Sequence, residues 1–242
     1  MREKYIVEAA LAEEQQTVVN QRQFLRLISH EMRTPLAIID STAQIIPFVK
    51  DDGDQVMRNA EAIRAASRQL SELMSTYLTH DRLVSGGMQP HFKPINICDF
   101  LGNLVAQIQL TAGNHHIHCE LPNTPIIFSC DPMLVEILVR LLLDNAVKYS
   151  PGSETVVVRA TFHSSGELCI EVIDCGSGMT AEQIGHAFEP YYRADAIHGV
   201  GGFGLGLNLA KHIAELHGGS ISCSSIPLQG STFTVNLKQV IP

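Results

Sequence analysis

The most reactive combination in this sequence is a histidine beside a carboxylate, His30 and Glu31. An imidazole next to a carboxylate can act as a nucleophile that its neighbour makes more basic. Thr34 lies four residues after His30 and shares its helix face, while Pro35 removes the N–H that would bond the carbonyl of Glu31 and bends the helix. The His-Glu-x-x-His zinc signature fails because position 34 is threonine. Taken alone, the pair is also compatible with an exposed helical histidine that has no catalytic role.

A second candidate is a glycine-rich segment that contains Gly199, Gly201 and Gly204 in the spacing Gly-x-Gly-x-x-Gly. No predicted strand precedes it and no acidic residue follows about 20 residues later, which excludes a dinucleotide-binding fold. The chain also lacks the Gly-x-x-x-x-Gly-Lys motif. A glycine loop that leads into a helix can bind phosphate through the helix N-terminus. The alternative is a purely structural turn.

Two smaller polar clusters complete the set: Asn145, Lys148 and Tyr149 at the end of a predicted helix, and Asp174, Gly176 and Gly178 after a predicted strand. An amide oxygen can bind a hard cation and an ammonium group can bind phosphate, so the first cluster suits a metal–phosphate ligand. A carboxylate between glycines can accept from the exocyclic amine of a planar base. Each cluster alone is a weak signal.

Hydrophobic spacing predicts the elements that position these groups. A seven-residue series predicts one long helix, and a second series predicts another that ends near Arg82. The two series are Leu11, Val18, Leu25, Met32 and Ile39, and then Val56, Ile63, Leu70 and Tyr77. Pro47 and residues 50–54 interrupt the pattern and predict a turn. Two amphipathic helices leave apolar surface in water, so we expect two chains to form a four-helix bundle, with a bundle inside one chain as the alternative.

After a linker at residues 85–90 the pattern becomes mixed. Helices are predicted at 99–110, 132–148 and 205–216, and strands at 155–161, 168–173, 221–225 and 232–237. Asp131 is the expected N-cap of the second of these helices, with Pro132 at its first position. We therefore expect residues 1–85 to form a helical hairpin and residues 86–242 an α/β sandwich.

Composition narrows the function further. The 242 residues are 45% hydrophobic, and 17 basic against 25 acidic residues give a net charge of −8. This charge argues against a nucleic-acid-binding surface. Six cysteines without Cys-x-x-Cys spacing favour a reduced, cytoplasmic compartment. No apolar run approaches the roughly 18 residues of a membrane span, and the first residues do not resemble a signal peptide.

The order of the pieces carries more information than any one of them. The histidine helix, the asparagine helix end, Asp-x-Gly-x-Gly, the aromatic segment 187–195 and the glycine segment follow one another between Gln23 and Val240. This order resembles the catalytic core of bacterial two-component sensor histidine kinases. The resemblance implies an all-α helical hairpin that forms a dimeric four-helix bundle, followed by an α/β sandwich ATPase domain of the histidine kinase and Hsp90-like type.

The resemblance also implies roles for residues of the first domain. His30 corresponds to the acceptor of the γ-phosphoryl group of ATP, Glu31 to its general base, and Thr34 to the residue that orients a water for dephosphorylation of a response regulator. The regulator is expected to be a separate receiver protein, because no receiver-like segment occurs in this chain. The stimulus would enter through a sensor region, and the chain resembles the cytoplasmic output part of a receptor anchored in the inner membrane.

In the second domain, the resemblance makes Asn145 the Mg²⁺ ligand, Lys148 a phosphate contact and Tyr149 a ring near ATP. Asp174 corresponds to the carboxylate that binds the adenine amino group, Gly176 and Gly178 give it room, and Thr232 supports it through water. The remaining positions belong to a lid over the nucleotide: Phe188, Tyr191 and Arg193 in its aromatic part, Gly202, Gly204 and Gly206 in its glycine hinge, and Leu207 directly after the hinge.

Some positions depart from the family pattern or are compatible with another interpretation. Leu141 stands where the family usually has a second asparagine, which favours a rival class, a non-catalytic nucleotide-binding module that regulates other kinases. A related ATPase that phosphorylates no histidine is a second rival, and the motif around His30 argues against it. Tyr191 replaces a commoner phenylalanine. His116 and His118 would share a strand face, but no further metal ligand is near in the sequence.

Overall fold

The computed structural model describes residue 29 and residues 32–84, 89–150, 152, 155–163, 166–193 and 204–239. These residues fall into two compact units, one that ends at Leu78 and one that begins at Thr79. The boundary lies inside one long helix, so the last six residues of that helix belong to the second unit.

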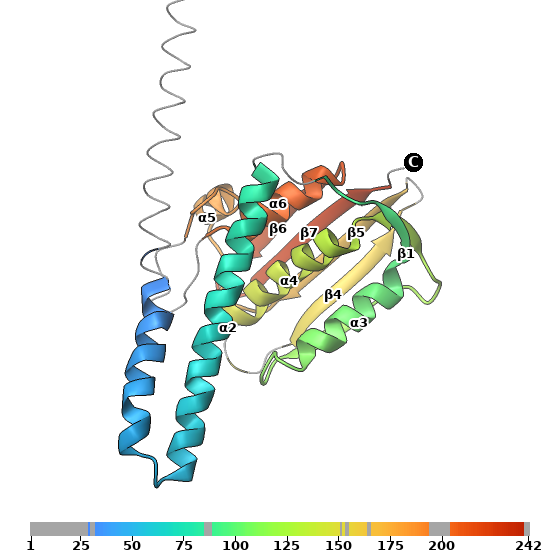
Figure 1. Ribbon diagram of the computed structural model, residues 1–242. Helices are drawn as coiled ribbons and strands as arrows, with labels where there is room; N and C mark the ends of the chain where they lie inside the picture. Colours follow the sequence, from blue (N-terminus) through green and yellow to red (C-terminus); the bar gives the residue numbers. More distant parts are fainter. Residues whose placement is uncertain are drawn as a thin grey trace, which may run out of the picture. The chain divides into compact units, whose positions relative to one another are not determined.

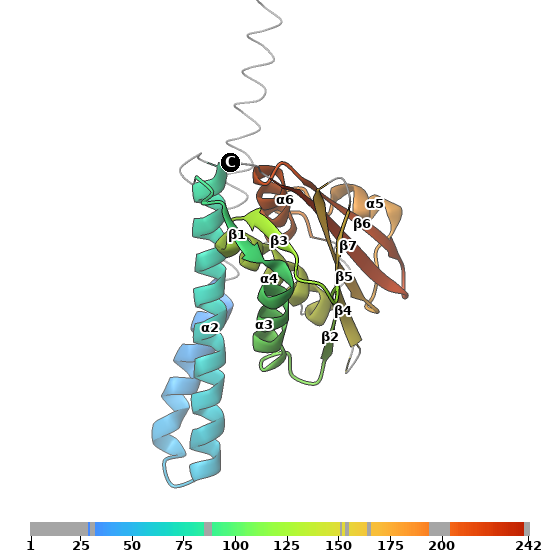
Figure 2. The same ribbon diagram turned by 90° about the vertical axis from the view of Figure 1, so that its right-hand side faces the viewer.

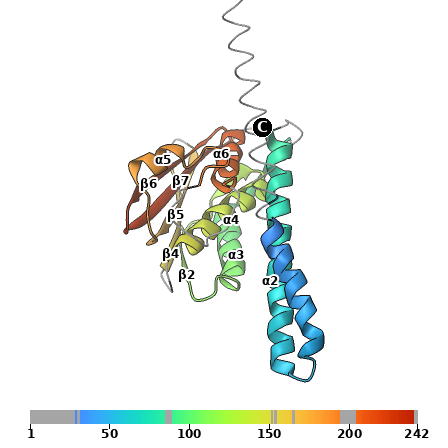
Figure 3. The same cartoon turned by 90° about the vertical axis from the view of Figure 1, so that its left-hand side faces the viewer.

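The described part of the first unit is a helical hairpin, as the sequence predicted; the expected earlier part of the first helix, with Leu11, Val18 and Leu25, lies outside the described residues. Residues 32–45 are helical, a 3₁₀ turn η1 (Ile46–Phe48) follows, and α2 (Gly53–Val84) returns antiparallel to the first helix (Figures 1 and 3). Pro47 lies at the start of the 3₁₀ turn, where its fixed φ angle is favourable. Asp52 Oδ1 accepts a hydrogen bond of 3.0 Å from the N–H of Gln55 and so caps the first turn of α2.

This hairpin buries few of its apolar side chains. Ala66 is 3% exposed, and the large side chains that remain exposed are Leu36, Ile38, Ile45, Phe48, Met57, Met74 and Leu78. Phe48 is 88% exposed at the turn. The described part of the unit therefore keeps much of its apolar surface in contact with water.

The second unit is built on a five-stranded sheet of order β2-β4-β5-β7-β6. Its strands are β2 (His116–Glu120), β4 (Thr155–Phe162), β5 (Glu167–Asp174), β6 (Ser220–Ile226) and β7 (Gly230–Lys238). β2 pairs parallel with β4, and the other neighbours are antiparallel. A separate antiparallel pair joins β1 (Lys93–Asn96) to β3 (Ile127–Cys130).

Three helices cover one face of the sheet: α3 (Ile97–Gln109), α4 (Pro132–Tyr149) and α6 (Gly206–Leu216) (Figure 2). The alternating residues of β4, β5 and β7 that face them are almost fully buried, and together with the helices they form one core. As predicted, Asp131 caps α4, because its Oδ1 accepts from the N–H groups of Met133 and Leu134. The predicted helices and strands of this unit are confirmed to within two residues at their ends. The sequence patterns predict no range for β1, β2, β3 or the short helix α5 (Ala181–His186).

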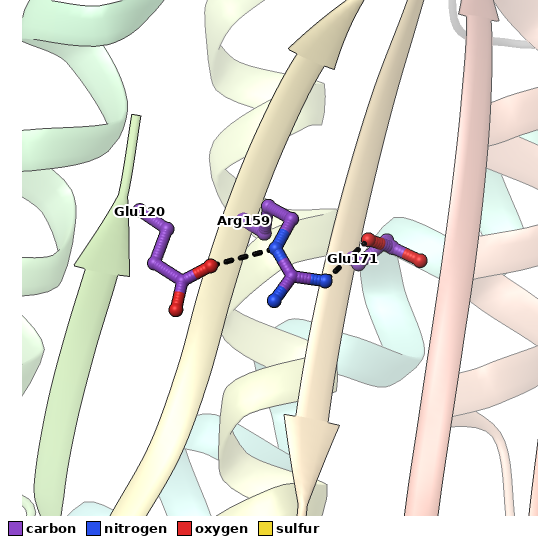
Figure 4. Close-up of polar contacts among 3 residues, drawn as sticks. All are labelled: Glu120, Arg159 and Glu171. Atoms are coloured by element: carbon purple, nitrogen blue, oxygen red, sulfur yellow. Dashed lines mark hydrogen bonds and ion pairs between the residues drawn. The ribbon is translucent and has the colours of Figure 1, made fainter. Parts of the chain in front are cut away.

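The other face of the sheet is polar. Arg159 of β4 lies between two carboxylates of the neighbouring strands, with its Nε 2.7 Å from Glu120 Oε2 and its Nη1 3.3 Å from Glu171 Oε2 (Figure 4). Opposite charges at paired positions stabilise the alignment of β2, β4 and β5.

Two further observations concern the cysteines and the length of the helices. All six cysteines are free thiols. In the part of the chain that the structure describes, no helix combines the length and the apolar character that a membrane crossing requires.

Candidate functional site

Asp174 is the last residue of β5, and its side chain is only 5% exposed. Its Oδ1 accepts hydrogen bonds from the N–H of Gly176 at 2.8 Å and from the N–H of Ser231 at 3.2 Å. Two backbone donors on one oxygen hold the carboxylate in a fixed direction. Burial and the charge of Asp174 raise the pKa of the nearby Cys223 thiol to about 12, so this thiol stays neutral.

The turn after Asp174 can form only because its neighbours are glycines. A Cβ at Gly176 would lie 2.5 Å from the carbonyl oxygen of Tyr149, and one at Gly178, whose φ is +63°, would overlap with the carbonyl oxygen of Ile226. A Cβ at Gly230 would overlap with the carbonyl oxygen of Asp174. The turn thus packs directly, backbone against backbone, on the end of α4 and on the β6–β7 hairpin.

The structure places Thr232 away from the Asp174 carboxylate. Side chains alternate along a strand, and in β7 the buried residues are Ser231, Phe233 and Val235, which face the helices as Asp174 does. Thr232 therefore lies on the opposite face of the sheet from the Asp174 carboxylate. Ser231, which is 8% exposed and paired with Asp174, occupies the position beside that carboxylate.

The end of α4 brings its polar cluster to this turn. The N–H of Ser177 donates to the carbonyl oxygen of Tyr149 at 3.1 Å. Lys148 Nζ lies 5.2 Å from the centre of the Tyr149 ring. Burial raises the pKa of Tyr149, and the positive charge of Arg193 opposes this shift. Two of the predicted positions, Lys148 at the α4 end and Gly176 in the turn, thus lie close to Tyr149.

Asn145 is half-buried on α4, one turn before Lys148. Leu141, one turn earlier still, packs against the core, and its Cδ2 lies 3.5 Å from where a Cβ of Gly206 would be. The start of α6 therefore lies beside the α4 face that carries Asn145.

The glycine segment is described only from Gly204 onward, so Gly202 lies outside the described residues. Gly204 has a φ of +65°, and a Cβ there would lie 2.5 Å from the carbonyl oxygen of Tyr192. The N–H of Tyr191 donates to the carbonyl oxygen of Gly204 at 2.9 Å, which joins the end of the aromatic segment to the start of α6. Gly206 is the first residue of α6, and Leu207 packs against the core.

Asn208 is a functional candidate that the sequence did not indicate. Its Nδ2 donates to the carbonyl oxygen of Phe188 at 2.9 Å, and its Oδ1 lies 3.0 Å from Nε2 of His80. Both His80 and Asn208 are buried, at 8% and 6% exposure. Burial and the neighbouring His212 lower the pKa of His80, while its hydrogen bond to Asn208 opposes the shift. Asn208 thus connects the last turns of α2 to the aromatic segment.

Only part of the motif around His30 lies within the described residues. His30 and Glu31 lie outside the described residues. Thr34 is exposed on the helix of residues 32–45 and lines a shallow hollow together with Arg33, Ala37, Ile38 and Ser41. His116 and His118 are exposed on one face of β2, and the described residues contain no group of three histidine, cysteine or acidic side chains that could hold a metal.

Two family models match this chain. Residues 20–86 match the His Kinase A (phospho-acceptor) domain. Residues 130–241 match the ATPase family described as histidine kinase-, DNA gyrase B- and HSP90-like.

Curated proteins that are named sensor kinases match most of this chain. The sensor-like histidine kinase SenX3 of Mycolicibacterium smegmatis is 29% identical over 222 residues, which are 90% of this chain and 57% of SenX3. The sensor histidine kinase YkoH of Bacillus subtilis is 31% identical over 90% of this chain and 48% of YkoH. The chain thus spans about half the length of these relatives.

Solved structures agree at the level of the fold. The histidine kinase AdeS of Acinetobacter baumannii superimposes with a TM-score of 0.66 at 21% identity, over 88% of this chain and 98% of the AdeS chain. Full-length ShkA in complex with AMPPNP also gives a TM-score of 0.66 at 21% identity, over 91% of this chain and 46% of that chain.

Proposed function

Because this chain belongs to the sensor histidine kinases, we propose that it transfers the γ-phosphoryl group of ATP to His30 and then to an aspartate of a separate response regulator. The observation that supports this best is the fixed carboxylate of Asp174, held by two N–H donors beside the glycine turn and the α4 end. A carboxylate accepts hydrogen bonds only, which matches the exocyclic amino group of adenine.

The residues divide the work of phosphoryl transfer between them. Asp174 binds adenine, and Ser231 takes the supporting role first given to Thr232. Gly176 and Gly178 let the backbone approach the base. Tyr149 lies beside the base. Lys148 and the start of α6, with Gly204, Gly206 and Leu207, bind phosphates through an ammonium group and backbone N–H groups. Gly202 and Arg193 belong to the lid in this proposal.

Phosphorylation then requires His30 at the γ-phosphorus. A nitrogen of its imidazole forms the new N–P bond while the bond to the bridging oxygen breaks and ADP leaves, and Glu31 takes the imidazole proton. Reactions of this class depend on positioning and charge neutralisation more than on covalent chemistry by the protein. Thr34, which lines a shallow hollow, would position a water for a separate reaction, the dephosphorylation of the regulator.

Mg²⁺ fits the residues that are present. An amide oxygen is a ligand for hard cations, and Mg²⁺ commonly binds through one or two protein groups, waters and substrate phosphates. Asn145 would hold it, with its half-buried amide on the α4 face next to the start of α6. When bound, the ion would neutralise charge on the phosphates.

We also propose a domain organisation and a partner set. Residues 1–85 would form the dimerisation and phosphotransfer hairpin, and residues 86–242 the ATP-binding domain. The exposed apolar side chains of the hairpin favour a homodimer. A sensor region, joined to the inner membrane, would lie in a part of the receptor that this sequence does not cover, with the present chain on the cytoplasmic side.

Leu141 favours a second candidate, a non-catalytic nucleotide-binding module that regulates other kinases. This side chain cannot ligate a metal, and it packs against the core where the family usually carries an amide. The same packing leaves Asn145 on the face of α4 beside α6, which is why we prefer the kinase.

Incubation of the chain with γ-labelled ATP and Mg²⁺ separates the candidates. The kinase gives protein-bound phosphate that acid releases and base does not, and the label moves to a cognate receiver domain when one is added. ATP binding without label in the protein would support the non-catalytic module instead.

A further inference from the structure

Ser225 of β6 is the centre of a hydrogen-bond network under the Asp174 turn. Its Oγ accepts from the N–H of Met179 at 2.8 Å, donates to the carbonyl oxygen of Gly230 at 2.8 Å, and lies 3.0 Å from Oγ of Ser231. One side chain thus touches the end of the turn, the start of β7 and the residue beside Asp174.

The directions of these hydrogen bonds follow from counting protons. A serine hydroxyl has one proton and two lone pairs. The proton of Ser225 goes to the carbonyl oxygen of Gly230, which can only accept, and one lone pair takes the N–H of Met179. The remaining lone pair faces Ser231, so Ser231 must donate the hydrogen bond between the two hydroxyls.

This direction determines what Ser231 can offer a ligand. Its only proton is committed to Ser225, and its N–H is committed to Asp174 Oδ1, so its hydroxyl oxygen can only accept from any other group. Ser231 and Asp174 are paired residues on the same sheet face. The two side chains therefore present acceptors side by side.

We infer that Ser225 is a specificity-determining residue of the nucleotide site, because it orients the Ser231 hydroxyl as an acceptor and so selects a ligand that donates there. This inference rests on the proposed function and deepens it. Adenine carries an amino group at position 6 and donates to the acceptor pair. Hypoxanthine carries a keto oxygen at the same position, which would meet acceptors and find no donor.

The probes are ADP and IDP, whose bases differ at position 6 and in the proton on N1, titrated calorimetrically into the full chain. In Ser225→Ala the Ser231 proton is released and can turn to a keto oxygen. We expect the ratio of the IDP to the ADP dissociation constant to fall by about tenfold, the effect of roughly one hydrogen bond. Ser224→Ala is the matched control, since Ser224 is the neighbouring residue on the exposed face of β6, and it should keep the parent ratio.

Ser225→Thr and Ser225→Val form a second, isosteric pair that carries the test if the alanine variant does not fold. The threonine variant keeps a hydroxyl and should keep the ratio, whereas the valine variant should lower it. Circular dichroism and thermal unfolding establish that each variant is folded.

The outcomes distinguish the role of Ser225 from the proposed function. A folded Ser225→Ala or Ser225→Val variant with the parent ratio overturns the role of Ser225 and leaves the proposed function intact. Loss of discrimination in Ser225→Thr as well would also overturn it, because the hydroxyl would not be the cause. A parent chain that binds neither nucleotide overturns the proposed function together with this inference.

Discussion

The two units treat apolar surface in opposite ways. The α/β unit buries its core side chains almost completely; Leu138 and Ile170, for instance, are 0% exposed. The helical hairpin keeps Leu36 at 53% and Met57 at 62% exposure. Burial of apolar surface contributes about 25 cal/mol per Å². The α/β unit therefore contains its own main source of stability, whereas the described part of the hairpin would gain stability from a partner that covers its apolar side chains.

The candidate functional groups of the two units also differ in how firmly they are held and how exposed they are. Asp174 is held by backbone donors and by close glycine contacts, so its position is built into the fold. Thr34 lies exposed on a helix. A nucleotide site benefits from fixed groups, whereas a group that acts on a separate regulator, as proposed for Thr34, must be open to that protein. The comparison predicts that changes in the two units affect different measurements.

The largest expected effect is from His30→Gln. Protein-bound phosphate should fall to the background, because the only proposed acceptor nitrogen is lost, while calorimetry should give the parent affinity for ADP. Acid-labile phosphate retained on the variant would contradict the assignment of His30.

Leu138→Ala should lower the free energy of unfolding of the α/β unit by about 2–5 kcal/mol, since it opens a cavity in a closed core. Leu36→Ala is the matched change in the hairpin. It should leave that unfolding transition in place and raise the dimer dissociation constant, measured by analytical ultracentrifugation. An unchanged dissociation constant would show that no partner covers Leu36.

Asp174→Asn should weaken ADP and ATP binding equally, by roughly 1–3 kcal/mol, because the lost charged contact is to the base and not to the γ-phosphate. Isothermal titration with both nucleotides measures this. A variant that binds ADP as the parent does would remove adenine from the proposed role of Asp174.

Thr34→Ala should leave the rate of autophosphorylation unchanged. It should slow dephosphorylation of the cognate regulator by about tenfold, because the water loses the group that positions it. The lifetime of the regulator phosphate in the presence of ADP measures this effect. The helix should be unchanged or slightly favoured, since alanine is the better helix former, and circular dichroism checks it. An equal lifetime with parent and variant would assign Thr34 to packing only.

The smallest expected effect is a pH dependence that belongs to the α/β unit alone. His217 Nδ1 donates to the carbonyl oxygen of Ile213 at 2.8 Å, and its Nε2 accepts from the N–H of Asp131 at 3.1 Å, so the folded unit requires the neutral ring. Burial lowers the pKa of His217 below its ordinary value of 6.5. The stability from this group is fully present above pH 6.5 and is lost as the pH falls from there through the folded-state pKa.

Denaturant unfolding between pH 5 and about 8 measures this dependence. His217→Gln should flatten the slope at the acidic end, whereas His116→Gln, a change at an exposed position of β2, should leave it as in the parent. A parent chain whose stability does not fall below pH 6.5 would contradict the requirement for a neutral His217.

Local patterns in the sequence were enough for the longer helices, the strands β4 to β7 and the order of the motifs. Asp131 before Pro132 marks the start of α4 in any context, because capping depends on residues within one turn. The alternation of apolar and polar residues along β4 and β5 also predicted these strands, since a strand with one buried face repeats every two residues. The short strands β1 and β3 carry too few residues to show such a period.

Which residues meet at the site was decided by the tertiary structure. Thr232 and Ser231 are equally suitable hydroxyls in the sequence, and only the pairing of β7 with β5 puts Ser231 beside Asp174. A shift of one residue in that register would exchange the two faces. The network around Ser225 and the contact of His80 with Asn208 join residues 46 and 128 positions apart. No local pattern records such contacts, because they depend on where the sheet and the helices bring distant backbone together.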